Sequence, residues 1–262
     1  MRNMRDFALR PDKYIVSLCL FGAFWCCFNL AALWLNTMPC DDVAARYAPM
    51  AEEFAKGNFR AAFHPRFGIF FPGLAGTIVY LTGLDGFRGC QAAAVLLYLL
   101  SAFPLYSLTC RIWDRRVAWC NVVLYLMCSH LLRLAWEGLR DTGKTTGFIL
   151  MSYGIVAIAQ DHVQKRGYLA LASGGAILVM IKGDGALTAL LIFLLAFILE
   201  VRKCRLKAWR TYAAAVLCLL VISPQLIYNL NLLGYPVPEV RHAQLLKRMG
   251  VAPLKKATVE YP

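Results

Sequence analysis

Long apolar runs separated by short charged turns dominate the sequence. The first run, residues 14–35, has 22 residues without a charge, and about 20 apolar residues suffice for a helix to cross a bilayer. Six further runs lie at 91–110, 117–132, 145–159, 167–181, 186–199 and 211–230. The pattern predicts an all-α polytopic membrane protein with about seven transmembrane helices.

A further apolar stretch, residues 67–81, is only 15 residues long and contains Gly68, Pro72, Gly73 and Gly76. Lys and Arg counts decide whether it crosses, because cytoplasmic turns are enriched in these residues. If it does not cross, the turns at 111–116, 164–167 and 200–210 share the side of the basic N-terminus and carry three, two and five Lys or Arg. The opposite side's short turns carry Arg133, Arg140, Lys144 and Lys182. We therefore expect a re-entrant segment, a retained first span with a cytoplasmic N-terminus, and a chain that ends outside.

The composition supports a membrane protein. The chain is 60% hydrophobic and 16% charged, whereas soluble domains carry about 25% charged residues. The net charge of +13 does not indicate a nucleic-acid partner, because the cations lie at the ends of apolar runs, where they set topology and meet lipid phosphates. The ten cysteines show no metal-binding spacing, and we interpret them as packing residues. Cys40 and Cys90 are one pair that an oxidising compartment would allow to form a disulfide.

The longest polar stretch, residues 41–66, reads DDVAARYAPMAEEFAKGNFRAAFHPR. It belongs to the predicted first extracytoplasmic loop, residues 36–90. Apolar residues at three- and four-residue spacing, Val43, Tyr47, Ala51 and Phe54, predict an amphipathic helix on the membrane surface, kinked near Pro49 and ending at Gly57-Asn58. Asp41 and Asp42 are good N-cap residues for this helix, although capping explains one of them better than both.

The predicted topology brings four charged clusters, at 41–42, 64–66, 137–141 and 182–185, to the non-cytoplasmic face. Such charges beside spans are costly and usually functional. A carboxylate can remove the proton of a sugar acceptor, while cations stabilise charge on a departing phosphate. Attack from the opposite side would invert the anomeric carbon, by analogy with inverting glycosidases. The candidates are Asp41 and Asp42 for catalysis and Tyr47, His64, Arg66, Glu137, Arg140, Asp141, Lys144, Lys182 and Asp184 for substrate binding. No metal ligand is assigned and no cofactor is required, while dependence on a divalent metal stays open.

Simpler roles stand beside these. His64 can anchor a turn, Arg140 and Lys144 can extend to lipid headgroups without a substrate, and Lys182 and Asp184 can pair with each other. A transporter or flippase is a competing function, but the charges gather at one face and none lies in the middle of a span. A non-catalytic subunit is a third hypothesis.

Six segments in this order resemble membrane glycosyltransferases of the GT-C class, in the branch of protein O-mannosyltransferases and lipid A aminoarabinose transferases. They are DDVAARYAPMAEEFAKG, HPRFGIFFPGLAG, CRIWDRRVAW, EGLRD, KGDGAL and SPQLIYNLNLLGYPVP, and they extend over roughly residues 14–240. The resemblance implies a polyprenyl-phosphate sugar donor, a first-loop carboxylate as the base, and transfer on the periplasmic or luminal face. It also implies juxtamembrane helices in the first loop.

The sequence departs from this pattern in three ways. Arg66 stands where the family has a second proline after the histidine, and Asp41-Asp42 replaces the usual Asp-Glu. Tyr47 follows Asp41 by six residues where four are common, so either aspartate can be the equivalent of the family's base. Family members usually have further C-terminal spans, so we expect a fragment, a truncated paralogue or a module whose partner subunit supplies them. We therefore predict a GT-C-like transmembrane module at 1–230 and an extracytoplasmic tail at 231–262, in a bacterial inner membrane.

Overall fold

The computed structural model describes residues 13–35, 40–59, 63–64, 67–161, 165–204 and 209–254. These residues form helices and connecting turns, with no β-strand among them. The predicted all-α class is therefore confirmed.

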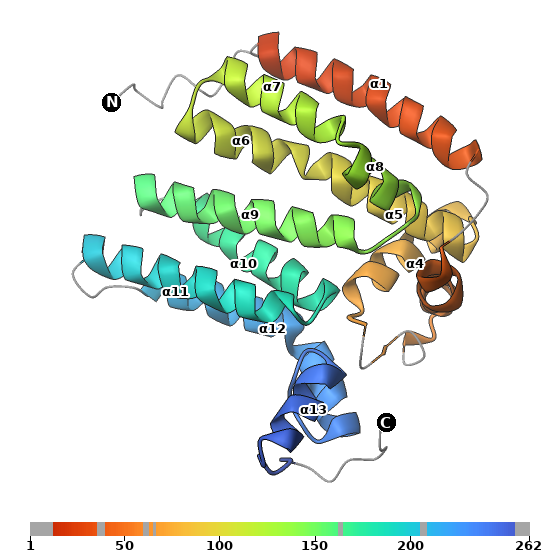
Figure 1. Cartoon of the computed structure of the whole chain (residues 1–262), viewed down its shortest axis with the longest axis vertical. Coiled ribbons are helices and arrows are strands. Elements are labelled where there is room, and N and C mark those ends of the chain that lie inside the picture. The colour runs from red at the N-terminus through yellow and green to blue at the C-terminus, as the bar shows by residue number, and fades with distance from the viewer. Residues whose placement is uncertain are drawn as a thin grey trace.

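Long helices lie side by side in a bundle (Figure 1). In chain order they are α1 (Lys13–Leu35), α5 (Gly86–Leu100), α6 (Ala102–Ile112), α7 (Arg115–Leu126), α8 (Ser129–Trp136), α9 (Asp141–Gln160), α10 (Lys165–Ile181), α11 (Gly185–Cys204) and α12 (Trp209–Leu233). The remaining helices are η2 (Val43–Tyr47), α2 (Ala48–Ala55), α4 (Phe70–Thr82) and α13 (Val240–Arg248).

The connections separate into two ends of the bundle. Helices α6, α9 and α11 end, and α7, α10 and α12 begin, at the end where α1 begins, whereas α8 and α10 end, and α9 and α11 begin, at the opposite end, with α2 and α4 (Figure 1). This is the grouping of turns that the charge pattern predicts. The end that holds α2 and α4 is called the loop end below.

Helix lengths support several membrane crossings. By length and hydropathy, Gly86–Ile112 with 27 residues, Gly185–Arg202 with 18 and Trp209–Leu233 with 25 can each cross a bilayer. Helices α7 and α8 make a fourth candidate if they count as one span, although they are bent by 50°. The number of seven spans stays a prediction. Helix α4 has 13 residues, about 20 Å against about 30 Å of hydrocarbon, a length that suits a re-entrant segment.

The amphipathic stretch of the first loop is helical, and α2 ends at Ala55, just before Gly57 with its positive φ of 81°. The π-helical turn η2 precedes Pro49, where we expected a kink. The apolar face of this stretch packs against protein, and its predicted position on the membrane surface stays a prediction. Val43 is 0% and Tyr47 2% exposed, in a cluster with residues of α4 and α5.

Close glycine contacts fix α9 against α10. A Cβ atom on Gly147 would lie 2.9 Å from the Gly174 carbonyl oxygen, and one on Gly154 would lie 2.8 Å from that of Gly167. Small residues allow helix backbones to approach this closely. The first turn of α9 and the last turn of α10 are thereby held beside each other at the loop end.

The cysteines are consistent with packing. Cys90 is buried, and Cys40 packs against the cluster that contains it. Both are free thiols in the structure, so the disulfide considered from the sequence is not formed.

Candidate active site

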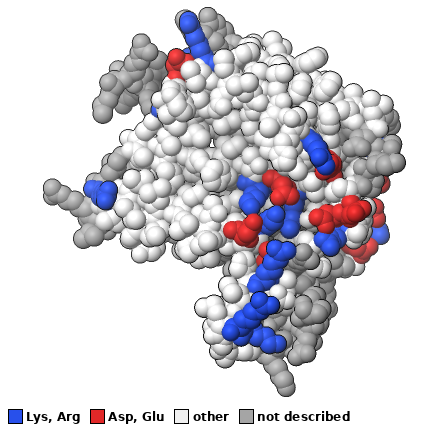
Figure 2. Space-filling view, viewed as in Figure 1, with Lys and Arg blue, Asp and Glu red and all other residues white. Residues whose placement is uncertain are grey.

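Charged side chains gather where α9 and α11 begin and around α2, while the middle of the long helices shows an uncharged surface in the same view (Figure 2). Residues of three predicted clusters, 41–42, 137–141 and 182–185, are joined in this region by the contacts described next, together with Lys144.

The acidic pair begins the helical run of the first loop, and its members differ. Asp42 has helical backbone angles, makes no capping hydrogen bond and instead accepts a hydrogen bond from Arg46 Nη1 at 2.5 Å. The capping interpretation is therefore wrong for Asp42. Asp41 is exposed, and no hydrogen bond or ion pair engages its carboxylate within the described part of the chain.

Tyr47, which follows the acidic pair on the same helical run, packs in a group of aromatic rings. Its ring meets those of Phe67 and Phe71 edge to face, with centroids 5.5 and 5.8 Å apart. Burial raises the pKa of Tyr47 to about 12. The charges of Asp42 and Asp141 also raise this pKa, while those of Arg140 and Arg46 oppose the shift. Tyr47 is thus a neutral phenol at physiological pH and is covered by protein.

The segment before α4 is held by α12. The backbone carbonyls of Phe63 and His64 accept hydrogen bonds from Tyr228 Oη and Gln225 Nε2, both at 3.2 Å. The His64 ring stacks on Phe67 with centroids 4.8 Å apart. These contacts hold the backbone and ring of His64 against protein, and its role in sugar or phosphate binding stays a prediction. Arg66 lies outside the described residues.

Gly68 brings the same segment against the end of α10. A Cβ atom at this position would lie 1.6 Å from the Met180 carbonyl oxygen, a distance that no side chain allows. The aromatic ring of Phe67 is therefore fixed beside the last turn of α10.

Arg140 joins the elements. Its guanidinium carbon lies 5.5 Å from the ring centroid of Tyr47 and 5.0 Å from that of Phe67, and Nη1 donates to the Ile181 carbonyl at 2.8 Å. The Arg46 guanidinium lies 5.3 Å from the same Phe67 ring. The path from Asp42 through Arg46 and Phe67 to Arg140 connects the first loop to α9 and α10.

Two ion pairs join the first turn of α9 to the α10–α11 turn. Lys144 Nζ lies 2.9 Å from Asp184 Oδ2, and Lys182 Nζ lies 3.6 Å from Asp141 Oδ1. The expected direct pairing of Lys182 with Asp184 is replaced by these two pairs. Each of the four side chains remains between 34% and 54% exposed, so a ligand can reach them.

The local charges also act on Asp184. Partial burial raises the pKa of its carboxyl, but the hydrogen bond from Lys144 and the charges of Lys144, Lys182 and Arg140 outweigh burial and hold the pKa below the ordinary value of 3.8. Asp184 is therefore ionised at neutral pH. Positive charge dominates its immediate surroundings.

Glu137 is not part of this connected group. Its Oε1 accepts a hydrogen bond from Arg133 Nε at 2.6 Å, one turn back on α8. No contact with another candidate is described for it. Glu137 and Asp141, both predicted to bind substrate, therefore belong to different contacts, because Asp141 pairs with Lys182 and Glu137 with Arg133.

The sequence interpretation missed Arg46 and Phe67, although both join the acidic pair to Arg140. Arg46 could have been found, since it follows Asp42 by four residues on a helix and such residues are neighbours. Phe67 gave no such signal. Among the residues described here, no group of three or more His, Cys, Asp or Glu is placed to hold a metal ion.

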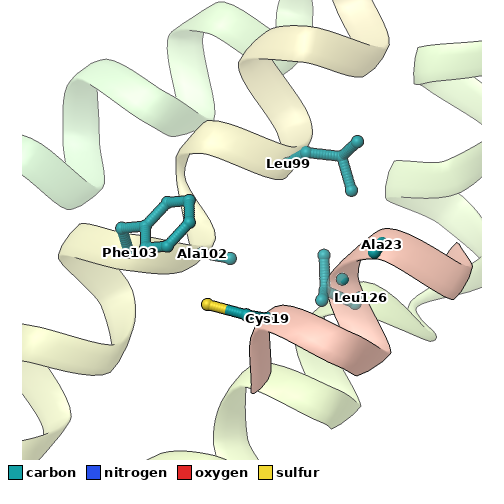
Figure 3. Close-up of a pocket in the computed structure, with 7 residues that line it drawn as sticks. Cys19, Ala23, Leu99, Ala102, Phe103 and Leu126 are labelled. Carbon is teal, nitrogen blue, oxygen red and sulfur yellow. The ribbon is translucent and has the colours of Figure 1, made fainter. Parts of the chain in front are cut away.

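A separate cavity of about 330 Å³ lies between α1, α5, α6 and α7. It is lined by Cys19, Gly22, Ala23, Leu99, Ala102, Phe103 and Leu126, and Figure 3 shows Cys19 and Ala23 of α1 across the space from Leu99 and Phe103. None of these side chains is a carboxylate, an imidazole or a cation that could hold a phosphate. We therefore place the candidate active site at the charged loop end and not in this cavity.

The fold and the site define an all-helical membrane protein with a cationic and acidic centre at one end of its bundle. The family model for dolichyl-phosphate-mannose-protein mannosyltransferase matches residues 66–228. The chain therefore belongs to this family of GT-C membrane glycosyltransferases, which use a lipid-linked sugar donor. Searches of curated proteins and of solved structures each found no match.

The family match bears on the competing functions, but it does not include the acidic pair. It favours a glycosyltransferase over a flippase. The matched residues include Arg140, Asp141, Lys144, Lys182 and Asp184, but the match begins after Asp41 and Asp42. The role of the acidic pair therefore depends on its geometry and on the resemblance of the first loop.

Proposed function

We propose that the protein transfers a sugar from a polyprenyl-phosphate donor to an acceptor hydroxyl at the loop end, with inversion at the anomeric carbon. The main support is the exposed Asp41 carboxylate, which lacks a partner within the described residues. It lies at the same end of the bundle as the cations of α9 and of the α10–α11 turn. A free carboxylate and separate cations are the groups that this reaction requires.

Asp41 is the better candidate for the base. The Asp42 carboxylate is engaged by Arg46 and helps to hold Arg46 over Phe67. In the proposed step, Asp41 takes the proton of the acceptor hydroxyl as the oxygen bonds to the anomeric carbon. The bond from that carbon to the phosphate oxygen breaks, and the lipid phosphate leaves as an anion.

The leaving phosphate would be met by Lys144, Lys182 and Arg140. The two lysine pairs are partly exposed, and pairs of this kind contribute about 0 to 1 kcal/mol each, so a phosphate can take over either lysine at little cost. Helices α9 and α11 both begin here, and their N-terminal N–H groups favour an anion. Arg140 is held in place by Tyr47 and Phe67 and would supply a fixed charge.

The proposed orientation places the loop end at the periplasmic or luminal face, with the N-terminus in the cytoplasm of a bacterium whose inner membrane holds the protein. The support is the concentration of Lys and Arg in the turns at the opposite end. The family match lends no support to a partner subunit, which is not part of the proposal.

The test is an assay of the purified chain with radiolabelled polyprenyl-phosphate sugars. Asp41→Asn is expected to reduce turnover at least a hundredfold, in the range of general base catalysis. Glu53→Gln is a matched control, because Glu53 is an acid of the same loop paired with Lys56 and Asn58. Unaltered turnover in Asp41→Asn would exclude Asp41 as the base. Full activity in both Asp41→Asn and Asp42→Asn would exclude the acidic pair.

A further inference from the structure

The segment after α12 folds back on the candidate site. Asn229 Nδ2 donates to the Val237 carbonyl at 2.7 Å, and both groups are buried. Tyr235 Oη donates to the Val251 carbonyl at 2.9 Å, and Leu233, Tyr235, Val237 and Ala243 form a small apolar cluster. Residues 233–251 therefore form a folded lobe, which projects from the bundle beside the loop end in Figure 1.

A buried carboxylate joins this lobe to the site. Glu239 is 4% exposed, and its Oε2 accepts a hydrogen bond from the backbone N–H of Gly183 at 3.1 Å. Its other oxygen, Oε1, lies 3.4 Å from Arg241 Nε. A buried charge is costly unless it is paired and hydrogen-bonded, and Glu239 has both kinds of partner. Neither the reaction proposed above nor the family match at 66–228 assigns a role to Glu239.

Only a glycine fits at position 183 beside Glu239. A Cβ atom on Gly183 would lie 2.5 Å from Glu239 Cβ, 2.5 Å from Glu239 Oε2 and 2.8 Å from His242 Cε1. A side chain at this position would therefore push the lobe away from the turn. The Glu239 carboxylate can therefore reach the Gly183 amide only because position 183 has no side chain.

The residues on both sides of Gly183 are the ones that face α9. Lys182 pairs with Asp141, and Asp184 pairs with Lys144. A hydrogen bond to the amide between them restricts the position of both side chains. Gly185 begins α11, so the Gly183 amide also lies at the entrance to that helix.

We propose that Glu239 is a positioning residue of the glycosyltransferase site, which holds the 182–184 turn so that Lys182 meets the donor phosphate. The catalytic part of this inference rests on the proposed function. The alternative is that Glu239 only attaches the lobe to the bundle. The two differ in their effect on the donor, because a simple attachment leaves donor binding by the folded protein unchanged.

The first measurement follows the turn itself and needs no turnover. Hydrogen–deuterium exchange of the full-length chain in nanodiscs is measured for a peptide that contains Gly183. Glu239→Ala is expected to speed exchange of this amide roughly tenfold, because a hydrogen bond to a charged group is lost. Glu239→Gln keeps a side-chain oxygen that can accept and should stay within about threefold of wild type. Lys247→Ala, at an exposed position of α13, is the matched control and should change nothing.

The second measurement is donor kinetics of the same proteins. Glu239→Ala is expected to raise the KM for polyprenyl-phosphate sugar roughly tenfold with a smaller change in kcat, and Glu239→Gln should restore most of the loss. Gly183→Ala should have a similar effect from the other side of the contact. The double variant Gly183→Ala with Glu239→Ala should lose less than the two single losses combined, because contacting residues are coupled.

The outcomes separate the two proposals. Unchanged exchange in Glu239→Ala would show that the carboxylate does not hold the turn and would overturn the inference. Faster exchange with an unchanged KM would overturn the positioning role and leave only an attachment. If the wild-type protein turned over no lipid-linked sugar, the proposed function would fail, and binding of sugar-free polyprenyl phosphate would replace KM as the measure. A tenfold weaker binding in Glu239→Ala would then still support the inference, and equal binding would overturn it.

Discussion

Arg140 lies against Phe67, with its guanidinium carbon 5.0 Å from the ring centroid, although 73 residues separate them in the chain. The same guanidinium donates to the last carbonyl of α10. The planar guanidinium stacks its face on the Phe67 ring and donates a hydrogen bond from its edge to the Ile181 carbonyl. It therefore contacts the segment before α4 and the end of α10 from its own position at the start of α9. This contact makes the first loop, α9 and α10 one structural unit at the loop end.

Arg140→Lys should therefore lower both stability and turnover, because an ammonium cannot meet the rings and the Ile181 carbonyl in the same geometry. We expect a loss of about 1 to 3 kcal/mol in the free energy of unfolding, from the weakened cation–π and hydrogen-bond contacts. Thermal unfolding in detergent measures this loss, with Arg248→Lys as a control at an exposed arginine of α13. Equal melting temperatures for Arg140→Lys and wild type would contradict the assigned role.

Tyr47 should make stability depend on alkaline pH. Its pKa in the folded protein is about 12 against 10.0 as the ordinary value, so the folded state holds the phenolic proton more tightly than the unfolded state. The resulting stabilisation is fully present below pH 10 and is lost as pH rises from about 10 to about 12. The full loss is about 3 kcal/mol from a shift of about two pKa units.

Denaturant unfolding of wild type and Tyr47→Phe at several pH values measures this dependence. The phenylalanine variant keeps the aromatic contacts and has no proton to lose, so the difference between the two proteins should grow above pH 10. Parallel curves for wild type and Tyr47→Phe up to pH 11 would show that the phenol is not protected by burial.

Lys144→Gln should raise the pKa of Asp184, because it removes the ammonium that donates a hydrogen bond to the carboxylate. The depressed pKa in the wild type contributes stability above the ordinary value of 3.8, and this contribution disappears as pH falls through the lower folded value. The two proteins should therefore differ in stability at neutral pH and converge in acid. Because both side chains are well exposed, we expect a difference below about 1 kcal/mol.

Steady-state kinetics with the sugar donor test the proposed role of Lys144 in phosphate binding. If Lys144 meets the leaving phosphate, Lys144→Gln should reduce kcat/KM for the lipid-linked sugar by roughly tenfold or more. Lys56→Gln is the control, since Lys56 also pairs with an acid but lies outside the connected group. A kcat/KM equal to that of wild type would remove Lys144 from the phosphate site.

The glycine contacts between α9 and α10 should tolerate no added methyl group. Gly147→Ala would place its Cβ 2.9 Å from the Gly174 carbonyl oxygen, and overpacking of this kind costs about 1 to 3 kcal/mol. Separation of the helices should also weaken the pairs at 141–144 and 182–184. Gly22→Ala is a matched helical control, because nothing lies within 4 Å of a Cβ there. Equal unfolding temperatures for the two variants would contradict this account.

Much of the fold could be predicted from the sequence because apolar length and charge bias are direct physical constraints on a membrane chain. The helical class, the grouping of turns at two ends and the end of α2 near Gly57 follow from them. The partners of individual charges did not follow. Lys182 and Asp184 are two residues apart in the sequence. Only the close approach of α9 to the end of α10 shows that Lys182 pairs with Asp141 and Asp184 with Lys144, both on α9.

The environment of the first-loop helix was also beyond the sequence. An apolar stripe indicates that a face is covered, but the same stripe suits lipid and protein, and Val43 and Tyr47 turned out to face α4 and α5. Glu239 was hidden for a related reason. It lies in the stretch we had treated as an extracytoplasmic tail, and no local pattern connects it to Gly183, 56 residues earlier.

The continuous stretch Gly86–Ile112 has a consequence for where the chemistry takes place. Its 27 residues extend for about 40 Å, roughly 10 Å more than the hydrocarbon layer. If Arg111 marks the cytoplasmic boundary, the excess emerges at Gly86, whose N–H donates to Glu52 Oε1 at 3.1 Å. The first-loop helix is then raised to the depth of the headgroups. In the reaction proposed above, a water-soluble acceptor would approach Asp41 from the aqueous side, and the lipid-linked donor would reach the site from within its leaflet.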